Sequence, residues 1–320
     1  MQICLMIEGQ EGVTWPQWLG LADACERHGL AGLFRSDHYT SVMGVAGRGS
    51  LDAWATLAAL AARTSRIRLG TLVSPVTFRH PSVLAKNVVT VDQVSGGRAE
   101  LGIGAGWQEH EHRTYGFPMP PLPVRLSLLT EQLEIVTRSF AESGFSFAGS
   151  HYRVEDLDAE PKPVQRPRPT VLVGGSGRPR SLALAARYAD EYNTVSASVD
   201  EVRGLRGRLE AAWRDAGRDP ASARLSLMTG CVVASDRGEL LERVGRVLAV
   251  IGSDERPQDA LAGRAERWVV GTVDQVVERL GALAAAGLDR VMLQHLAHDD
   301  LEMVALLGRT VAPALARAGG

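Results

Sequence analysis

The hydrophobic and polar positions of this chain form two kinds of segment that alternate along most of its length. Short, nearly continuous apolar runs predict buried strands, whereas longer segments whose apolar residues recur every three or four positions predict amphipathic helices. One predicted strand is therefore followed by one predicted helix over most of the sequence. The runs predicted as strands are residues 2–7, 32–34, 66–73, 99–103, 170–175, 191–195, 225–233 and 290–294.

The predicted helices lie between these strands and after the last of them. Some carry residues that typically begin or end a helix, such as Pro81 at the start of one and Gly29 after another. The predicted helices cover residues 15–28, 51–63, 81–95, 125–142, 179–187 and 199–216, a segment from 236, a segment from 271, and 301–316.

Eight strands that alternate with helices in a chain of 320 residues predict a (β/α)8 barrel, the TIM-barrel fold. The alternative is a doubly wound parallel sheet that binds a dinucleotide. In that fold a glycine fingerprint should follow the first strand, but residues 8–12 (Glu-Gly-Gln-Glu-Gly) do not fit it. The barrel is the favoured fold, and we expect residues 1–320 to form a single domain.

Three segments interrupt the alternation. Residues 145–154 alternate apolar and polar side chains around a Gly-Ser turn, which predicts a β-hairpin. The proline-rich residues 161–169 lead directly into a strand, so we interpret them as a bracing loop across the barrel floor rather than a domain linker. Residues 252–267 show no regular pattern, and we expect an inserted lid or loop there.

Composition and charge narrow the class of protein. The hydrophobic content of 45% is enough for a full core, and 35 basic against 37 acidic residues favour neither nucleic acid nor a membrane surface as a partner. The three cysteines are scattered in apolar runs, which predicts reduced, buried thiols in a cytoplasmic protein. Residues 2–7 lack the features of a signal peptide, and no apolar run is long enough to span a bilayer.

The most informative stretch ends the fourth predicted strand. Gly102, Gly104 and Gly106 alternate through its end, and Trp107 follows directly. Because glycine has no Cβ, a flat ligand can lie against the bare backbone. Ligands of a barrel bind at the C-terminal ends of its strands, where this stretch falls. The pattern predicts a ligand site, although a bulge or a tight bend would use the same glycines.

A second glycine-rich segment, residues 174–177 (Gly-Gly-Ser-Gly), lies between a predicted strand and a predicted helix. Free backbone N–H groups and a helix N-terminus converge at such a junction, and this arrangement binds phosphate. Arg178 and Arg180 would either add positive charge to the site or be solvated side chains. The alternative is an ordinary glycine-rich turn.

The second predicted strand ends in Ser36, Asp37 and His38. Adjacent residues cannot face one another as a nucleophilic triad requires, so we do not interpret them as a hydrolase site. Asp37 and His38 instead offer a carboxylate and an imidazole at a pocket rim, where the imidazole can give or take a proton. The alternative is a structural aspartate that caps a loop, with the histidine packed under it.

Metal binding has little support in the sequence. His80, Glu109, His110, Glu111 and His112 are suitable residue types, but the histidines at 110 and 112 are only two positions apart. No His-x-x-x-His pair on a predicted helix supports tetrahedral ligation. We therefore expect no metal ion.

Five segments occur in an order and a spacing that resemble one known family over nearly the whole chain. They are residues 34–39 (Phe-Arg-Ser-Asp-His-Tyr), 64–71 (Thr-Ser-Arg-Ile-Arg-Leu-Gly-Thr), 92–98 (Asp-Gln-Val-Ser-Gly-Gly-Arg), 102–107 (Gly-Ile-Gly-Ala-Gly-Trp) and 173–177 (Val-Gly-Gly-Ser-Gly). The chain resembles the bacterial luciferase-like monooxygenase superfamily, and within it the actinobacterial branch that uses the 5-deazaflavin coenzyme F420.

The resemblance implies a TIM barrel with luciferase-like insertions and a set of site residues. Asp37 and His38 would touch the deazaflavin ring as the catalytic pair, with His38 assisting through a proton. Leu72 and Val73 would form a non-prolyl cis peptide behind the ring. The other cofactor-binding residues that it implies are Ser36, Ser74, Gly104, Gly106 and Trp107 near the ring and ribityl chain, and Gly174, Gly175, Ser176 and Gly177 at the phosphate.

Two departures from the family pattern bear on the substrate. The sugar-phosphate dehydrogenases of this branch have a tryptophan where this chain has Val42, and a glutamate where it has Trp107. These differences argue against glucose 6-phosphate as the substrate.

The expected function is hydride transfer between C5 of F420 and an unsaturated, carbonyl or imine small molecule. By family likeness the expected assembly is a homodimer. Two alternatives remain open at this point: an FMNH2-dependent luciferase-like monooxygenase, and a non-catalytic flavin-binding barrel.

Overall fold

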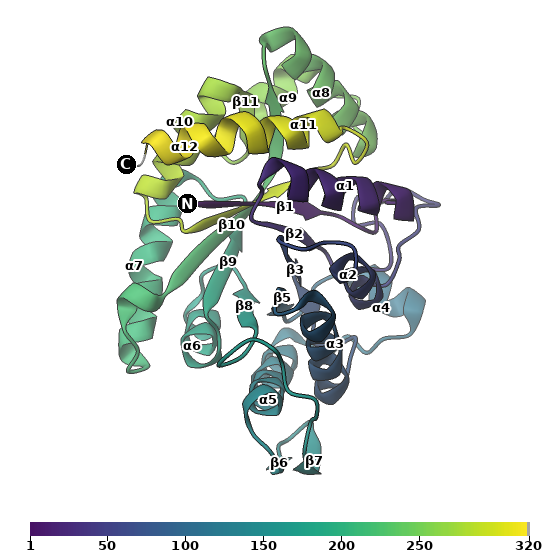
Figure 1. The fold of residues 1–320 in the computed structure, drawn as a ribbon, viewed down its shortest axis with the longest axis vertical. Helices are drawn as coiled ribbons and strands as arrows, with labels where there is room; N and C mark the ends of the chain where they lie inside the picture. Colours follow the sequence, from purple (N-terminus) through teal and green to yellow (C-terminus); the bar gives the residue numbers. More distant parts are fainter. Residues whose placement is uncertain (319–320) are drawn as a thin grey trace.

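Eight parallel strands close into a barrel in the computed structural model, which describes residues 1–318 (Figure 1). The barrel closes because the first strand pairs in parallel with both the second and the last. The predicted (β/α)8 barrel is therefore confirmed. Its strands are β1 (Gln2–Ile7), β2 (Gly32–Arg35), β3 (Arg68–Thr71), β5 (Ala99–Gly104), β8 (Thr170–Gly174), β9 (Glu191–Val195), β10 (Arg224–Ala234) and β12 (Arg290–Gln294).

Helices surround the strands, and the chain passes from strand to helix around the barrel (Figure 1). Most helices bury one face, as their apolar periodicity predicts. A π-helical turn (Leu307–Val311) joins the last two. The helices that follow barrel strands are α1 (Trp15–His28), α2 (Ala53–Ala61), α3 (Pro81–Ser95), α5 (Leu122–Ala141), α6 (Pro179–Tyr188), α7 (Val199–Asp215), α8 (Arg237–Val250), α10 (Val273–Ala285), α11 (Leu301–Leu306) and α12 (Ala312–Ala318).

Besides a short 3-10 helix (Pro220–Ser222), two α-helices and two strands were not expected from the sequence. The helix α4 (Glu109–Tyr115) has no apolar periodicity, because its sequence is Glu-His-Glu-His-Arg-Thr-Tyr. The helix α9 (Pro257–Arg264) corrects the expectation that residues 252–267 are irregular. The short strands β4 (Ser74–Pro75) and β11 (Val269–Thr272) depend on pairing with β5 and β10, which local pattern does not reveal.

The hairpin and the proline-rich loop form as expected. The hairpin consists of β6 (Phe145–Ala148) and β7 (Arg153–Leu157), which project from one end of the molecule (Figure 1). In the loop, the backbone N–H of Val164 donates to Asp92 at 2.6 Å. The Gln165 side chain donates to Asp92 and to the carbonyl of Ala99, both at 2.7 Å. The loop therefore ties the end of α3 to the start of β5 at the barrel floor.

The barrel interior is layered, because alternate residues of each strand point inward. At the N-terminal end, the Arg290 guanidinium donates to Glu100 at 2.8 Å and to Glu191 at 2.6 Å, and all three residues are buried. The next layer is apolar and consists of Cys4, Met6, Phe34, Leu72, Leu172 and Met292. Polar side chains return only at the C-terminal ends of the strands, where the candidate site lies.

Candidate active site

A cavity of about 540 Å³ opens at the C-terminal ends of the barrel strands. This is a normal size for a small-molecule or cofactor site, and most of its wall is apolar side chain and glycine backbone. The residues that line it are Glu8, Ser36, His38, Val42, Leu72, Val73, Pro75, Gly104, Ala105, Gly106, Trp107, His112, Gly174, Gly175, Ser176, Asn193, Val195 and Met228.

The cavity brings together most of the residues predicted for the site. Only three of the predicted residues, Asp37, Ser74 and Gly177, are absent from its wall. Those that line it are Ser36, His38, Leu72, Val73, Gly104, Gly106, Trp107, Gly174, Gly175 and Ser176.

His38 is held at the cavity by a buried carboxylate. Its Nδ1 lies 2.8 Å from Oε2 of Glu111, whose side chain is fully buried and also accepts the backbone N–H groups of Tyr39 and Thr40. Burial alone would lower the pKa of His38, but the hydrogen bond and negative charge of Glu111 outweigh burial, so the pKa is raised. Because Nδ1 faces Glu111, Nε2 is the ring nitrogen left for a ligand.

Trp107 forms the outer part of the wall beside His38. The two ring centroids are 5.7 Å apart and the rings meet edge to face. Trp107 is 61% exposed, a high value for so large an apolar side chain. An aromatic face that reaches solvent at a cavity mouth can pack against a flat ligand.

Asp37 lies behind the wall and not at its surface. Its carboxylate accepts two hydrogen bonds from the Arg79 guanidinium, at 2.6 and 3.2 Å, and one from the Ser74 hydroxyl at 2.6 Å. The Ser74 hydroxyl in turn accepts the indole N–H of Trp54. Neither Asp37 nor Ser74 lines the cavity, and their contact with a bound ring stays a prediction. The hydrogen bonds of Asp37 also fit the alternative of a structural aspartate.

The peptide bond between Leu72 and Val73 is cis, as the resemblance implies. The Val73 side chain packs against the glycine wall. A Cβ added to Gly104 would lie 2.8 Å from Val73, and one added to Gly174 would lie 3.2 Å from it. Glycine is therefore required here for packing, and the result is a flat surface at the base of the cavity.

The predicted phosphate loop offers fewer donors than expected. The N–H of Gly175 donates to the carbonyl of Asn193 at 3.0 Å, and that of Gly177 donates to the Tyr192 hydroxyl at 2.8 Å. Gly177 is buried and does not line the cavity, and its contact with a phosphate stays a prediction. Ser176 is exposed at the cavity wall, and Arg178 and Arg180 are exposed at the start of α6. The loop can still bind an anion through these side chains and the helix N-terminus.

Three residues at the cavity or bonded to its wall were not predicted from the sequence or were considered only as metal ligands. Glu111 and His112 reach the site because α4 folds over the cavity. His112 Nε2 lies 2.6 Å from the Thr77 hydroxyl, and its Nδ1 lies 2.7 Å from the carbonyl of Gln108. Glu8 lines the cavity at the end of β1. The sequence does contain an indication of this position, because Glu8 lies two residues beyond the inward-facing Met6 and side chains alternate along a strand.

Among residues 1–318, no three His, Cys, Asp or Glu side chains are grouped so that they could hold a metal ion. The three cysteines are buried and unpaired, as predicted. None of the helices that the structure describes has the length and apolar character needed to cross a membrane.

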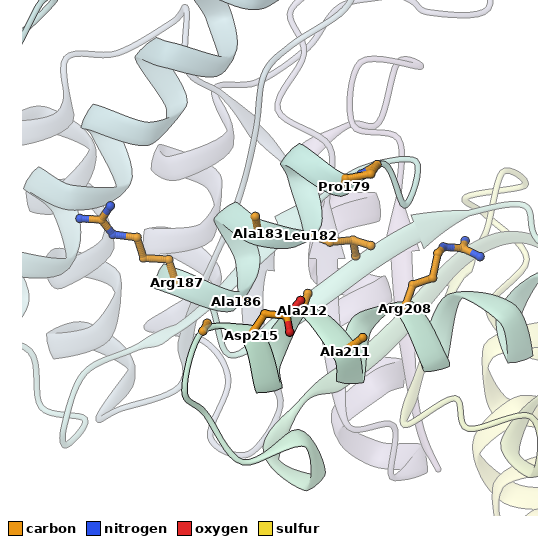
Figure 2. Close-up of a pocket in the computed structure, with 10 residues that line it drawn as sticks. Pro179, Leu182, Ala183, Ala186, Arg187, Arg208, Ala211, Ala212 and Asp215 are labelled. Atoms are coloured by element: carbon orange, nitrogen blue, oxygen red, sulfur yellow. The ribbon is translucent and has the colours of Figure 1, made fainter.

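A larger hollow, about 720 Å³, lies on the outside of the barrel between α6 and α7 (Figure 2). Alanine and leucine side chains form most of its wall, and Arg187 and Arg208 point away from it in opposite directions (Figure 2). It contains none of the predicted site residues. Ten of those residues instead line the cavity at the barrel mouth.

Two buried histidines near the mouth predict how stability depends on pH. His295 and His298 follow β12, and burial lowers the pKa of each to about 4. Both ring nitrogens of His295 and the Nε2 of His298 have no hydrogen-bond partner among the described residues. These rings are neutral in the folded protein, whereas an unfolded histidine takes up a proton below about pH 6.5.

The folded state should therefore lose stability as the pH falls from about 6.5 to about 4, by up to roughly 3 kcal/mol per histidine. We expect His295→Phe to reduce this loss, measured by urea unfolding at pH 7 and pH 4.5. His151→Phe, on the exposed turn of the hairpin, is the matched control and should leave it unchanged. An equal pH dependence for His295→Phe and the wild-type protein would contradict this assignment.

Comparison with known proteins identifies the family to which this chain belongs. The model of the luciferase-like monooxygenase family matches residues 2–290. The chain belongs to this family. Members of the family are oxidoreductases and monooxygenases, and its relatives use either F420 or FMN.

Two curated relatives represent these two cofactors. An F420-dependent glucose-6-phosphate dehydrogenase of Microbacterium testaceum is 29% identical over 308 residues, which cover 91% of this chain and 90% of the relative. An FMNH2-dependent dimethylsulfone monooxygenase of Pseudomonas putida is 28% identical over 283 residues, which cover 80% of this chain and 76% of the relative. The crystal structure of monooxygenase RslO1 from Streptomyces bottropensis is 25% identical, covers all of both chains and superposes with a TM-score of 0.84.

Proposed function

We propose that this chain is an F420-dependent oxidoreductase that reduces a carbonyl, an imine or an activated C=C bond of a small organic molecule. F420, when bound and reduced, supplies a hydride at C5 of its deazaflavin ring. The chain's own residues bind and orient the two reactants and supply a proton.

The observation that carries the proposal is the pair of His38 and Glu111 at the cavity. Glu111 raises the pKa of His38, so the imidazolium persists to a higher pH than that of a free histidine. A charged ring with Nε2 free can donate a proton to the oxygen or nitrogen of a bond that accepts a hydride at carbon. The same hydrogen bond fixes the direction in which the ring points.

The residues that would hold the cofactor fit a flat ring with a phosphate tail. The glycine wall at Gly104 and Gly174 and the Val73 side chain make a flat base that a ring can cover. An anionic tail would be stabilised by the start of α6 and by the side chains of Ser176, Arg178 and Arg180. The apolar wall would exclude water from the reacting atoms.

A second candidate is an FMNH2-dependent monooxygenase. It is favoured by the Pseudomonas putida relative and by the full-length superposition on RslO1. Of the two curated relatives, the F420-dependent dehydrogenase aligns over the larger share of both chains, and this supports F420. A non-catalytic flavin-binding barrel would need no acid beside the cavity, which the His38–Glu111 pair provides.

The test is calorimetric titration of the protein with oxidised F420 and, separately, with FMN. We expect F420 to bind at least about tenfold more tightly, a difference of about 1.4 kcal/mol. The protein with bound F420 should then catalyse reduction of at least one of 2-cyclohexenone, acetone and 1-pyrroline by reduced F420. Tighter binding of FMN, with oxygen consumed when FMN is reduced, would favour the monooxygenase. Binding without any turnover would favour the non-catalytic barrel.

A further inference from the structure

Glu8 places a carboxylate in the upper layer of the barrel. Cys4 and Met6 of β1 belong to the inward-facing apolar layer, and the alternation of side chains along a strand turns residue 8 the same way. Glu8 is only 6% exposed and lines the cavity. Its carboxylate is thus largely removed from bulk solvent and lies at the wall where a ligand would bind.

Two side-chain amides hold this carboxylate in place. Gln294 Nε2 donates to Oε1 at 2.6 Å, and Gln10 Nε2 donates to Oε2 at 2.7 Å. The orientation of Gln10 is set by the Ser36 hydroxyl, which bonds its Oε1 and accepts the backbone N–H of Gly9. A carboxylate has about four lone-pair positions, so each oxygen keeps capacity for a further donor.

Among residues 1–318, no Lys or Arg forms an ion pair with Glu8, whose negative charge also contributes to the raised pKa of His38. The residues that line the cavity include no Lys or Arg, and its other ionisable side chains are His38 and His112. His38 faces Glu111, and His112 is bonded to Thr77 and to the carbonyl of Gln108. A buried carboxylate that is bonded only to neutral amides attracts a cationic donor and repels an anion.

We propose that Glu8 is a specificity-determining residue that binds a cationic nitrogen group with N–H donors on the substrate. This inference rests on the proposed function, because it names the class of substrate for the same cavity. An N–H group of the substrate would donate a charge-assisted hydrogen bond to a Glu8 oxygen, which can accept a further bond. The rest of the substrate would be apolar and flat enough to pack against Trp107 and Met228. Carboxylate and phosphate substrates would be disfavoured by the same charge.

The test uses three probes of one shape that differ in charge: 1-naphthylmethylammonium, 1-naphthalenemethanol and 1-naphthoate. Each is titrated by calorimetry into the wild-type protein, both alone and saturated with F420. The same titrations are made with Glu8→Gln, which keeps the shape but removes the charge. Glu109→Gln is the matched control, because Glu109 is an exposed carboxylate at the start of α4 that does not line the cavity.

In the wild-type protein we expect the ammonium probe to bind at least about tenfold more tightly than the alcohol, and the carboxylate more weakly than both. Glu8→Gln should remove the preference for ammonium and change the affinity for the alcohol by less than about twofold. Glu109→Gln should keep the preference. The affinity for F420 should be the same in Glu8→Gln as in the wild-type protein.

Equal affinities of the wild-type protein for the ammonium and the alcohol would overturn the proposal, and this comparison needs no variant to fold. The proposal would also be overturned if Glu109→Gln lost the preference for the ammonium probe as fully as Glu8→Gln does. The preference would then come from the overall negative charge around the cavity mouth and not from Glu8. If Glu8→Gln lost more affinity for F420 than for the ammonium probe, Glu8 would bind the cofactor and not the substrate, and the proposal would be overturned. Failure of F420 to bind the wild-type protein would instead refute the proposed function, while the probe preference without F420 would still be measured.

Discussion

His38→Ala should lower turnover by about 10²–10⁴-fold while F420 affinity stays within a few-fold of the wild-type value. The substitution removes the only lining side chain that combines a raised pKa with a buried carboxylate partner. Turnover is measured with whichever of 2-cyclohexenone, acetone and 1-pyrroline the wild-type protein reduces fastest. His110→Ala, at an exposed histidine of α4 outside the cavity wall, is the control and should retain wild-type turnover.

Glu111 is a positioning residue in this account, and its effect should appear in the pH profile. Glu111→Gln removes the charge that raises the pKa of His38, so that pKa should fall. The limb of the profile that requires protonated His38 should then move to lower pH. Unchanged turnover in His38→Ala, or an unshifted profile in Glu111→Gln, would remove this pair from the mechanism.

Arg290→Leu should lower the free energy of unfolding by about 3–5 kcal/mol. The substitution leaves Glu100 and Glu191 buried at the barrel floor without the guanidinium that bonds both. Burial alone raises the pKa of Glu191, and the neighbouring Glu100 raises it further. Glu191 would then have no cationic partner and Glu100 would keep only Arg68, which would favour protonation or solvent entry at the floor.

The measurement is urea unfolding followed by circular dichroism. Arg203→Leu breaks an exposed ion pair with Asp200 and should change stability by less than about 1 kcal/mol. If Arg290→Leu lowered the free energy of unfolding by no more than Arg203→Leu does, the ion cluster at the floor would not stabilise the barrel.

The strands and most helices were predictable because their patterns are local. A short apolar run bounded by glycines or prolines favours a buried strand. The helix α4 could not be predicted this way, because Glu109–Tyr115 has no apolar stripe and is fixed by contacts of Glu111 and His112 with other segments. Glu111 was considered only as a metal ligand because its partner His38 lies far away in the sequence.

The direction of side chains at the strand ends also decides which residues reach the cavity. Ser36 and His38 line the cavity, whereas Asp37 between them faces Arg79 on the other side. Alternation along an extended strand end predicts this difference, and applying it would also have drawn attention to Glu8. At residues 174–177 the glycine pattern was read correctly as a strand-to-helix junction. The Asn193 and Tyr192 acceptors that occupy two of its N–H groups could be seen only in the fold.

The central claim is hydride transfer from a deazaflavin, and isotope transfer tests it most directly. The protein is mixed without oxygen with reduced F420 that carries deuterium at both hydrogen positions of C5, together with 2-cyclohexenone, acetone or 1-pyrroline, and the product is analysed by mass spectrometry. We predict one deuterium per product molecule on the carbon that is reduced, and one oxidised F420 for each product formed. A product formed only with reduced FMN and oxygen, with no deuterium and one added oxygen atom, would contradict the account.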